Sequence, residues 1–225
     1  MLFMSRAIEL QEQASAKTHR FVELVESNRI AAIIAQEEER ANDLLALAAV
    51  AKSLLCELAM YIALKRGEAD PAWTLLIDAQ DWLLTAARAS ARATNLSAKF
   101  DRLREMETWF FPPQQFTSLG VIVNEQHCSI CRADYAACDH IAGRAYLGRI
   151  CSIQIQQASV DHIALVEHPA DRRCRITSTK VPGGDRNVMT WRVTPGESKA
   201  GNMTAILAVT SAEPKDREGD LASMT

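Results

Sequence analysis

A short cysteine-rich stretch constrains this chain more than any other sequence feature. Cys128 and Cys131 are separated by two residues, and Cys138-Asp139-His140 follows after six more. A Cys-x2-Cys pair presents two thiolates to a zinc ion from one side, and a Cys-x-His pair can complete the tetrahedron from the other. Because four such ligands fill the coordination shell, the spacing predicts one structural zinc ion inside a small β-rich module.

The alternative interpretation of this stretch is a set of buried cysteines beside an incidental histidine. Met1–Arg6 lacks the basic stretch and apolar core of a secretory leader, and charged residues such as Lys52 and Glu57 interrupt the most apolar run. We therefore expect a cytoplasmic protein with no membrane span. In that reducing compartment, a cysteine cluster is more often a metal site than a set of disulfides.

Other potential ligands lie close to this stretch. His127 precedes Cys128 and is expected on the surface or in support of the ligands. Cys151 is expected to be a small buried strand residue, although its sequence distance also allows it to take part in the metal site. Cys56 and Cys174 are expected to be structural.

The first half of the chain has the composition of helices. One glycine and one proline, Gly67 and Pro71, precede Trp109, and apolar residues recur at spacings of three and four. We expect helices over residues 6–27, 29–66 and 71–107, forming a long antiparallel hairpin or a three-helix arm. Ser27-Asn28 is a weak break, so the alternative is that 6–27 and 29–66 are one helix. The apolar stripe on 29–66 is wider than one neighbour requires, which favours a protein partner or self-association through this arm.

Pro112-Pro113 cannot continue a helix, and after them the sequence pattern changes from helical to strand-like. The fold class expected is α+β: a helical arm over residues 1–110, a zinc-stapled and mostly antiparallel β module over 111–195, and a last strand and tail over 196–225. Short β-branched or alternating runs predict the strands, at residues 116–123, 146–157, 159–166, 175–181, 189–193 and 203–210.

Three segments resemble known families. Cys128–Gly148 resembles a zinc-knuckle segment of uncharacterised bacterial and phage-related proteins. Thr117–Val121 resembles the strand that carries the nucleophile in tailed-phage prohead serine proteases, and Ile163–Asp171 resembles a later strand and turn of that family. This second resemblance covers about residues 116–176, and it implies a small β-barrel with Ser118 as the nucleophile.

The chain departs from the protease pattern at the catalytic base. Those proteases carry their histidine on a strand upstream of the serine, whereas the histidine upstream of Ser118 is His19, on a predicted helix. His162 and His168 follow the serine and are the remaining candidate bases, because an activated serine needs a base within hydrogen-bond reach. We therefore expect a non-catalytic interaction or scaffold protein, with the serine hydrolase as the alternative.

Nucleic-acid binding through the zinc module is the second alternative. The formal net charge of −3 provides no polybasic field, so nucleic acid is not the expected partner. A small basic cluster could nevertheless form near the zinc, and it would need aromatic side chains on which bases stack. The basic residues are Arg144, Arg149, Arg172, Arg173 and Arg175, and the nearest aromatic residues are Tyr135 and Tyr146.

Overall fold

The computed structural model describes residues 7–196 and 202–207 of the chain. Helices precede antiparallel strands, which confirms the α+β class. Contacts divide the chain into two compact units, of which the first joins residues 120–162 to the helices and the second joins 114–119 to the chain after His162. This division differs from the boundary expected near residue 110, because the cysteine-rich stretch belongs with the helices.

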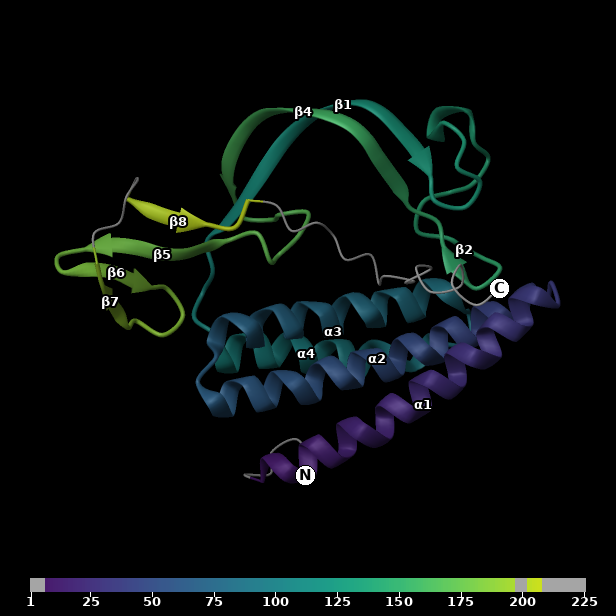
Figure 1. Cartoon of the computed structure of the whole chain (residues 1–225), viewed down its shortest axis with the longest axis horizontal. Coiled ribbons are helices and arrows are strands. Elements are labelled where there is room, and N and C mark those ends of the chain that lie inside the picture. The colour runs from purple at the N-terminus through teal and green to yellow at the C-terminus, as the bar shows by residue number, and fades with distance from the viewer. Residues whose placement is uncertain (1–6, 197–201, 208–225) are drawn as a thin grey trace, which may run out of the picture. The chain divides into compact units, whose positions relative to one another are not determined.

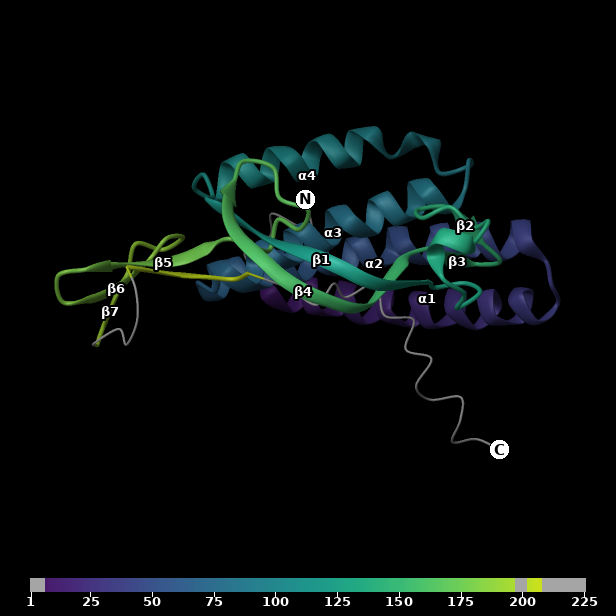
Figure 2. The same ribbon diagram turned by 90° about the horizontal axis from the view of Figure 1, so that it is seen from above.

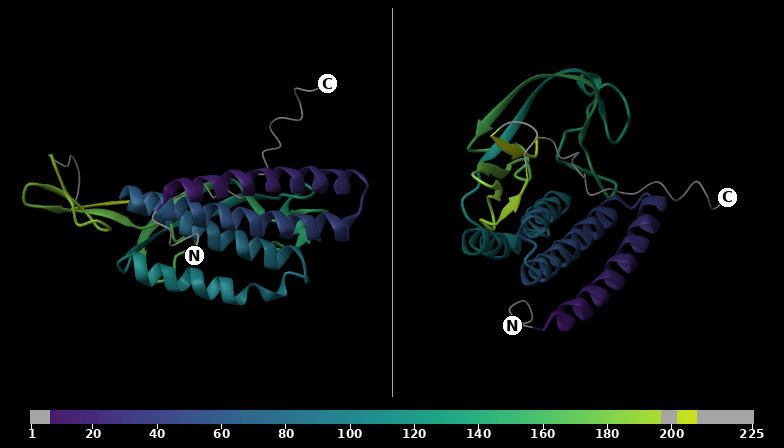
Figure 3. Two further views of the ribbon diagram at one scale, coloured as in Figure 1. Left: turned by 90° about the horizontal axis from the view of Figure 1, so that it is seen from below. Right: turned by 60° about the vertical axis from the view of Figure 1, so that its left-hand side comes forward.

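Helices that lie side by side make up most of the first unit (Figures 1 and 2). The second helix packs along the first and the third, and the fourth follows the third. Figure 3 shows the same arrangement from two further sides. The bounds are α1 Ile8–Ile34, α2 Glu38–Arg66, α3 Ala69–Ala89 and α4 Ser97–Phe110, with a single 3-10 turn, η1 Thr94–Leu96, before α4.

Small side chains bring α2 and α3 close together. Their packed faces contain many fully buried alanines, and larger residues such as Trp73 and Leu76 fill the remaining space. Trp73 also meets Phe111 edge to face at 5.3 Å. Each buried side chain of leucine size contributes about 1.5–3 kcal/mol to the free energy of folding. The interface between α2 and α3 is therefore the main source of stability in the helical layer. The buried alanines are Ala41, Ala46, Ala48, Ala49, Ala51, Ala63, Ala72, Ala79, Ala86 and Ala89.

The helix α2 is long and apolar enough to pass a compositional test for a membrane span, as core helices of soluble proteins also do. More than half of its most apolar window is buried inside the structure. Glu57 in this helix is fully buried, where it forms ion pairs with Lys99 and Arg102 of α4. A buried, paired carboxylate of this kind suits a helix that is packed among other helices.

The first reversal of the chain falls later than the sequence predicts. α1 continues through Ser27-Asn28, because the Asn28 amide donates within the helix to the carbonyl oxygen of Leu24 at 2.7 Å. The expected helices 6–27 and 29–66 are therefore wrong in their bounds. The chain turns instead at Gln36, whose φ of 57° is left-handed. The first helix then folds back along α2, so the three-helix form of the arm is the observed one.

The expected helix 71–107 is likewise wrong, because it is divided into α3 and α4. Ser90 ends α3 in an extended conformation, and its hydroxyl donates to the Asp43 carboxylate at 2.6 Å. The same hydroxyl accepts the backbone N–H of Arg92 at 3.1 Å. Serine commonly ends helices through such local bonds, but here the deciding partner lies on another helix.

A long two-stranded ribbon and a short hairpin follow the helices. The ribbon pairs β1 (Phe116–Cys128), which extends the expected strand 116–123, with β4 (Ile153–Val166). The expected strands 146–157 and 159–166 are wrong as two separate strands, because β4 runs without a break through residues 153–166. The hairpin pairs β2 (Ala145–Tyr146) with β3 (Arg149–Ile150). Between β1 and β2 lies the cysteine-rich loop, which contains the 3-10 turn η2 (Tyr135–Ala137).

The second unit contains a four-stranded antiparallel sheet of order β7-β6-β5-β8. Pro182 and Gly183 make the turn between β5 and β6, and Gly184 begins β6 opposite Val181. The expected strand 189–193 is wrong for most of its length, because Asn187 accepts the N–H groups of Met189 and Thr190 and closes a loop there. Residues 208–210 of the expected last strand lie outside the described residues. The bounds are β5 Ile176–Val181, β6 Gly184–Asn187, β7 Val193–Pro195 and β8 Met203–Ala205.

Candidate metal centre

Two tight turns place the three cysteines of the loop. β1 ends at Cys128, whose carbonyl oxygen accepts the N–H of Arg132 at 2.9 Å, and Cys131 lies on the turn thus closed. Arg132 has a left-handed φ of 63°, which allows the chain to reverse so sharply. The second turn is η2, which the Asp134 carboxylate caps at its start and which delivers Cys138 at its end.

The four residues that the sequence analysis predicted as ligands lie together. Their ligand atoms are all within 4.8 Å of one another, in an arrangement that can hold a metal ion. The sulfurs of Cys131 and Cys138 are 3.4 Å apart, and Nδ1 of His140 is 3.2 Å from the Cys138 sulfur. A tetrahedral zinc ion with Zn–S bonds of about 2.3 Å separates two sulfur ligands by about 3.8 Å, close to these values.

Backbone N–H groups point at two of the sulfurs. Ile130 donates its N–H to the sulfur of Cys128 at 3.4 Å, and His140 donates its N–H to the sulfur of Cys138 at 3.2 Å. Such bonds stabilise the thiolate over the thiol. The two turns thus each supply one N–H donor to a sulfur of the cluster.

The sulfurs perturb one another strongly. Burial raises the pKa of the Cys128 thiol, but N–H groups of the Cys131 turn and neighbouring thiols outweigh it and lower the pKa to about 6. Burial, together with the sulfurs of Cys131 and Cys128, raises the pKa of Cys138 to about 11. Without a cation the cluster thus favours one thiolate over several. Because a metal ion requires all its thiol ligands deprotonated, its binding must release protons.

Two tyrosines hold the second half of the loop. The Tyr135 hydroxyl accepts the N–H of Ala142, and the Tyr146 hydroxyl accepts the N–H of Ile141, both at 3.0 Å. The Tyr146 ring also meets the His140 ring edge to face, with centroids 4.7 Å apart. The Tyr146 ring packs against His140, and the two hydroxyls hold the backbone that follows the histidine, a role that no sequence pattern predicts.

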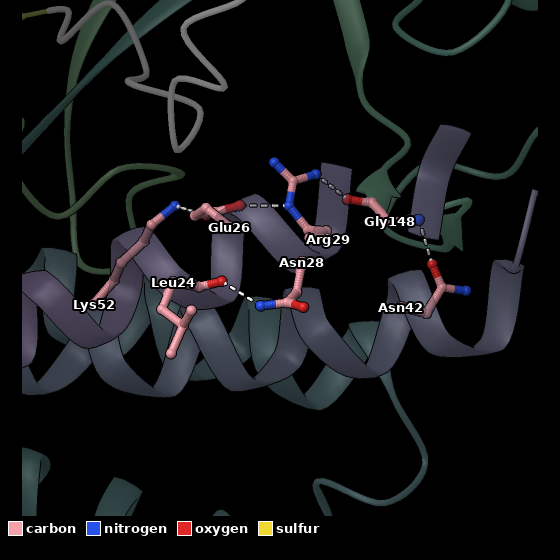
Figure 4. A network of polar contacts seen from close by, with 7 residues as sticks. All are labelled: Leu24, Glu26, Asn28, Arg29, Asn42, Lys52 and Gly148. Atoms are coloured by element: carbon pink, nitrogen blue, oxygen red, sulfur yellow. Dashed lines mark hydrogen bonds and ion pairs between the residues drawn. The ribbon is translucent and has the colours of Figure 1, made fainter. Parts of the chain in front are cut away.

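The hairpin next to the cluster is fixed to the helices. Gly148 at its tip donates its N–H to the Asn42 side chain at 2.7 Å, and its carbonyl oxygen accepts from Arg29 at 2.6 Å (Figure 4). Ala145 and Ile150 pack on the alanine-rich core between α2 and α3. The hairpin that follows the Cys/His cluster is therefore anchored to α1 and α2.

The two additional candidate ligands behave differently. His127 directs Nε2 to the Glu125 carboxylate at 3.1 Å, so this nitrogen is engaged outside the cluster. Cys151 is 1% exposed, as expected for a buried strand-like residue. Its sulfur, however, lies 3.7 Å from the sulfur of Cys128. The sequence distance of Cys151 allows it to take part in the site, and its thiol lies beside a predicted ligand.

The residues of the hydrolase alternative lie on the ribbon and just after it. Ser118 is in β1, and His162 in β4 holds the Asp161 carboxylate through Nδ1 at 2.9 Å. The His162 ring covers Gly120 so closely that a Cβ there would lie 2.4 Å from Cε1. His168 follows the end of β4. A catalytic role for these side chains stays a prediction.

The basic cluster of the nucleic-acid alternative is reduced by burial and pairing. Arg175 is 1% exposed, so its guanidinium is not a surface group. Arg173 is paired with the Asp171 carboxylate at 2.9 Å. Arg144 and Arg149 belong to the first compact unit, whereas Arg172 belongs to the second.

Comparison with known proteins identifies no relative of this chain. No protein-family model matches it, and no curated protein or solved structure matches it significantly. The function must therefore be argued from the geometry of the site and from the surfaces around it.

Proposed function

We propose that Cys128, Cys131, Cys138 and His140 bind one structural zinc ion in a non-catalytic interaction protein. The observation that carries this proposal is the convergence of four ligand atoms within 4.8 Å. Thiolate and imidazole ligands at tetrahedral spacing favour zinc over magnesium or calcium, which prefer oxygen ligands. Four protein ligands leave no open position for a substrate, which supports a structural ion.

The ion would join two pieces of chain that have little core of their own. Cys131 is exposed, and Cys138 and His140 are only half-buried. Apolar burial thus contributes little to the loop between β1 and β2, and metal binding can supply the missing free energy of folding. A closed loop in turn fixes the start of β2, which holds the hairpin against the helices.

The helical arm supplies the interaction surface of the proposed function. A groove of about 410 Å³ lies between α1 and α2 and is lined by Phe21, Leu47 and Leu54, among others. Phe21 is 42% exposed and Leu24 is 61% exposed beside it. Exposed apolar side chains next to an apolar groove mark a contact site. We propose that a second copy of this chain covers the groove.

Elemental analysis and cobalt substitution test the metal site. Protein purified without chelator should contain one zinc per chain, and cobalt replacement should give the absorption of a tetrahedral thiolate site. Cys131→Ser should reduce the zinc content at least tenfold, whereas Cys174→Ser, at a buried cysteine of the second unit, should retain it. Wild-type protein without zinc would refute the proposal.

Light scattering across a concentration range tests the arm. The wild-type mass should rise with concentration toward that of a dimer, and Phe21→Glu should return it to that of a monomer. Leu84→Glu is the matched control, because Leu84 on α3 is 41% exposed, as much as Phe21. A wild-type mass that stays monomeric throughout would show that no second copy covers the groove.

A further inference from the structure

A fourth sulfur, that of Cys151, lies beside the proposed site of three thiols and one imidazole. The thiols of Cys128 and Cys151 are 3.7 Å apart, and both side chains are almost fully buried. A closed Cys3His site needs no additional thiol. A small apolar side chain would fill the same space, so the position of this sulfur against a ligand sulfur requires its own explanation.

With Cys151 included, the sulfurs of the cluster form two pairs. Cys128 faces Cys151 at 3.7 Å, and Cys131 faces Cys138 at 3.4 Å. Without Cys151 the number of thiols would be odd, and oxidation of one pair would leave a single reactive thiol. Both pairs lie within the reach of a disulfide after small rotations of the side chains.

The backbone around Cys151 holds this pairing in place. Cys151 donates its N–H to the carbonyl oxygen of Arg144 at 2.8 Å, which ties it to the docked hairpin. On the other side, Ser129 donates its N–H to the carbonyl oxygen of Ser152 at 3.0 Å and accepts the Ser152 N–H through its hydroxyl at 2.8 Å. The chain segments that carry Cys128 and Cys151 are thus hydrogen-bonded neighbours.

We propose that Cys128–Cys151 and Cys131–Cys138 are the two disulfides that a hydroperoxide forms in this cluster, with loss of the metal and full recovery on reduction. The role of Cys151 is to pair with Cys128 so that no thiol is left for irreversible oxidation. This proposal rests on the zinc-binding function for its metal readout, while its disulfide readout is independent of metal.

The chemistry balances with one hydroperoxide for each pair. The exposed Cys131 thiolate attacks the peroxide oxygen, the O–O bond breaks, and sulfenic acid forms with release of one alcohol or water. The Cys138 sulfur then attacks that sulfur, the S–O bond breaks, and water leaves as the disulfide forms. Zinc has now lost two ligands and dissociates. Cys128 and Cys151 react with a second hydroperoxide by the same two steps.

Thiol counting on the full chain tests the pairing. Reduced, zinc-loaded protein is treated with hydrogen peroxide, the remaining thiols are alkylated, and peptides are mapped by mass with fragmentation. The wild type should lose four cluster thiols, carry the two named disulfides, release its zinc and regain it after reduction. Cys151→Ser should keep its zinc while reduced, lose two thiols to disulfide, and recover less than half of its zinc.

Control variants and contrary outcomes separate this proposal from the zinc site. Cys56→Ser and Cys174→Ser should behave like the wild type. A loss of only two thiols in the wild type, or a Cys128–Cys138 linkage, would overturn the pairing. Loss of zinc from reduced Cys151→Ser would overturn it too, since Cys151 would then be a ligand. If reduced wild type holds no zinc, the zinc proposal fails, and the thiol count of the metal-free chain still decides the pairing.

Discussion

Arg29 of α1 donates a hydrogen bond to the carbonyl oxygen of Gly148, 2.6 Å away and 119 positions later in the chain. The guanidinium is also paired with Glu26, and Lys52 of α2 binds the second oxygen of that carboxylate (Figure 4). One glutamate thereby links two helices to the arginine that holds the hairpin. Because a bond to a charged group is stronger than a neutral one, this contact is a main anchor of the cluster.

Gly148→Ala should destabilise the protein by about 1–3 kcal/mol. Gly148 has a left-handed φ of 71°, which disfavours a Cβ. The added Cβ would also lie 3.2 Å from the Cβ of Ala41 and 3.3 Å from Ile33 Cδ1. Urea unfolding of the zinc-loaded protein measures the loss.

Gly67→Ala separates strain from contact in that experiment. Gly67 also has a left-handed φ, of 75°, but a Cβ there meets nothing within 4 Å. Gly67→Ala should therefore lower the free energy of unfolding only by the conformational cost of a left-handed alanine, about 1–2 kcal/mol. Equal losses at both positions would show that the fit of the hairpin tip against α1 and α2 contributes nothing.

Glu26→Gln should lower the free energy of unfolding near neutral pH and should lower it less in acid. Burial raises the pKa of the Glu26 carboxyl, but bonds and charges from Lys52 and Arg29 outweigh it, and the pKa is lowered. A carboxyl with a lowered folded-state pKa stabilises the fold above its unfolded pKa of about 4.3, and that stabilisation is lost as pH falls through the folded value. We expect a loss of about 1–2 kcal/mol at pH 7.

Urea unfolding at several pH values, followed by helical circular dichroism, checks this. The difference between Glu26→Gln and the wild type should shrink below pH 4. Glu12→Gln is the control on the same helix, because its ion pair with Arg66 is half-exposed and should contribute less than about 0.5 kcal/mol. A difference for Glu26→Gln that does not change with pH would contradict the expected role of its charge.

Removal of the metal should open the cysteine-rich loop and leave the helices folded. Arg132 and Arg144 are exposed sites for trypsin within that loop. Chelator treatment should speed cleavage there at least about tenfold, because a locally unfolded segment is the form that a protease cuts. Cleavage after Arg66, between α2 and α3, is the internal reference and should not change. A loop that resists trypsin equally with and without chelator would argue against a structural ion.

Ser118→Ala should leave the biological effect of the protein unchanged. Catalysis by Ser118 is expected from a resemblance alone, and in the described part of the chain its hydroxyl makes no hydrogen bond to His162 or His168. A serine-reactive fluorophosphonate should therefore not label the wild type, and Ser159, on β4, offers a second serine for comparison. Labelling that disappears in Ser118→Ala and persists in Ser159→Ala would establish the hydrolase instead.

Residues with strong local preferences made much of this fold predictable. Gly67 ends α2 in the left-handed conformation that glycine favours, and Pro112-Pro113 follows one residue after α4 ends. The four ligands could be identified from spacing alone because tetrahedral coordination restricts where the ligands can stand.

Tertiary partners decided the features that the sequence did not reveal. Gln36 adopts a left-handed φ without glycine, and Ser90 ends α3 by bonding Asp43 on another helix. Neither the left-handed turn nor this helix end can be predicted from the local sequence pattern. The position of the Cys151 thiol likewise depends on hydrogen bonds between segments that are far apart in the sequence.

The span between Arg29 and Gly148 also sets an order of events during synthesis. At about 5–20 residues per second, roughly 6–24 s separate the appearance of these two partners on the ribosome. During that interval the α1–α2 turn has emerged, while the glycine that will occupy it is still untranslated. Helices therefore assemble before any cysteine of the cluster can be docked. If the cluster binds the proposed zinc, metal binding then follows the assembly of the helices, and a chain made without zinc would have finished helices and an open loop.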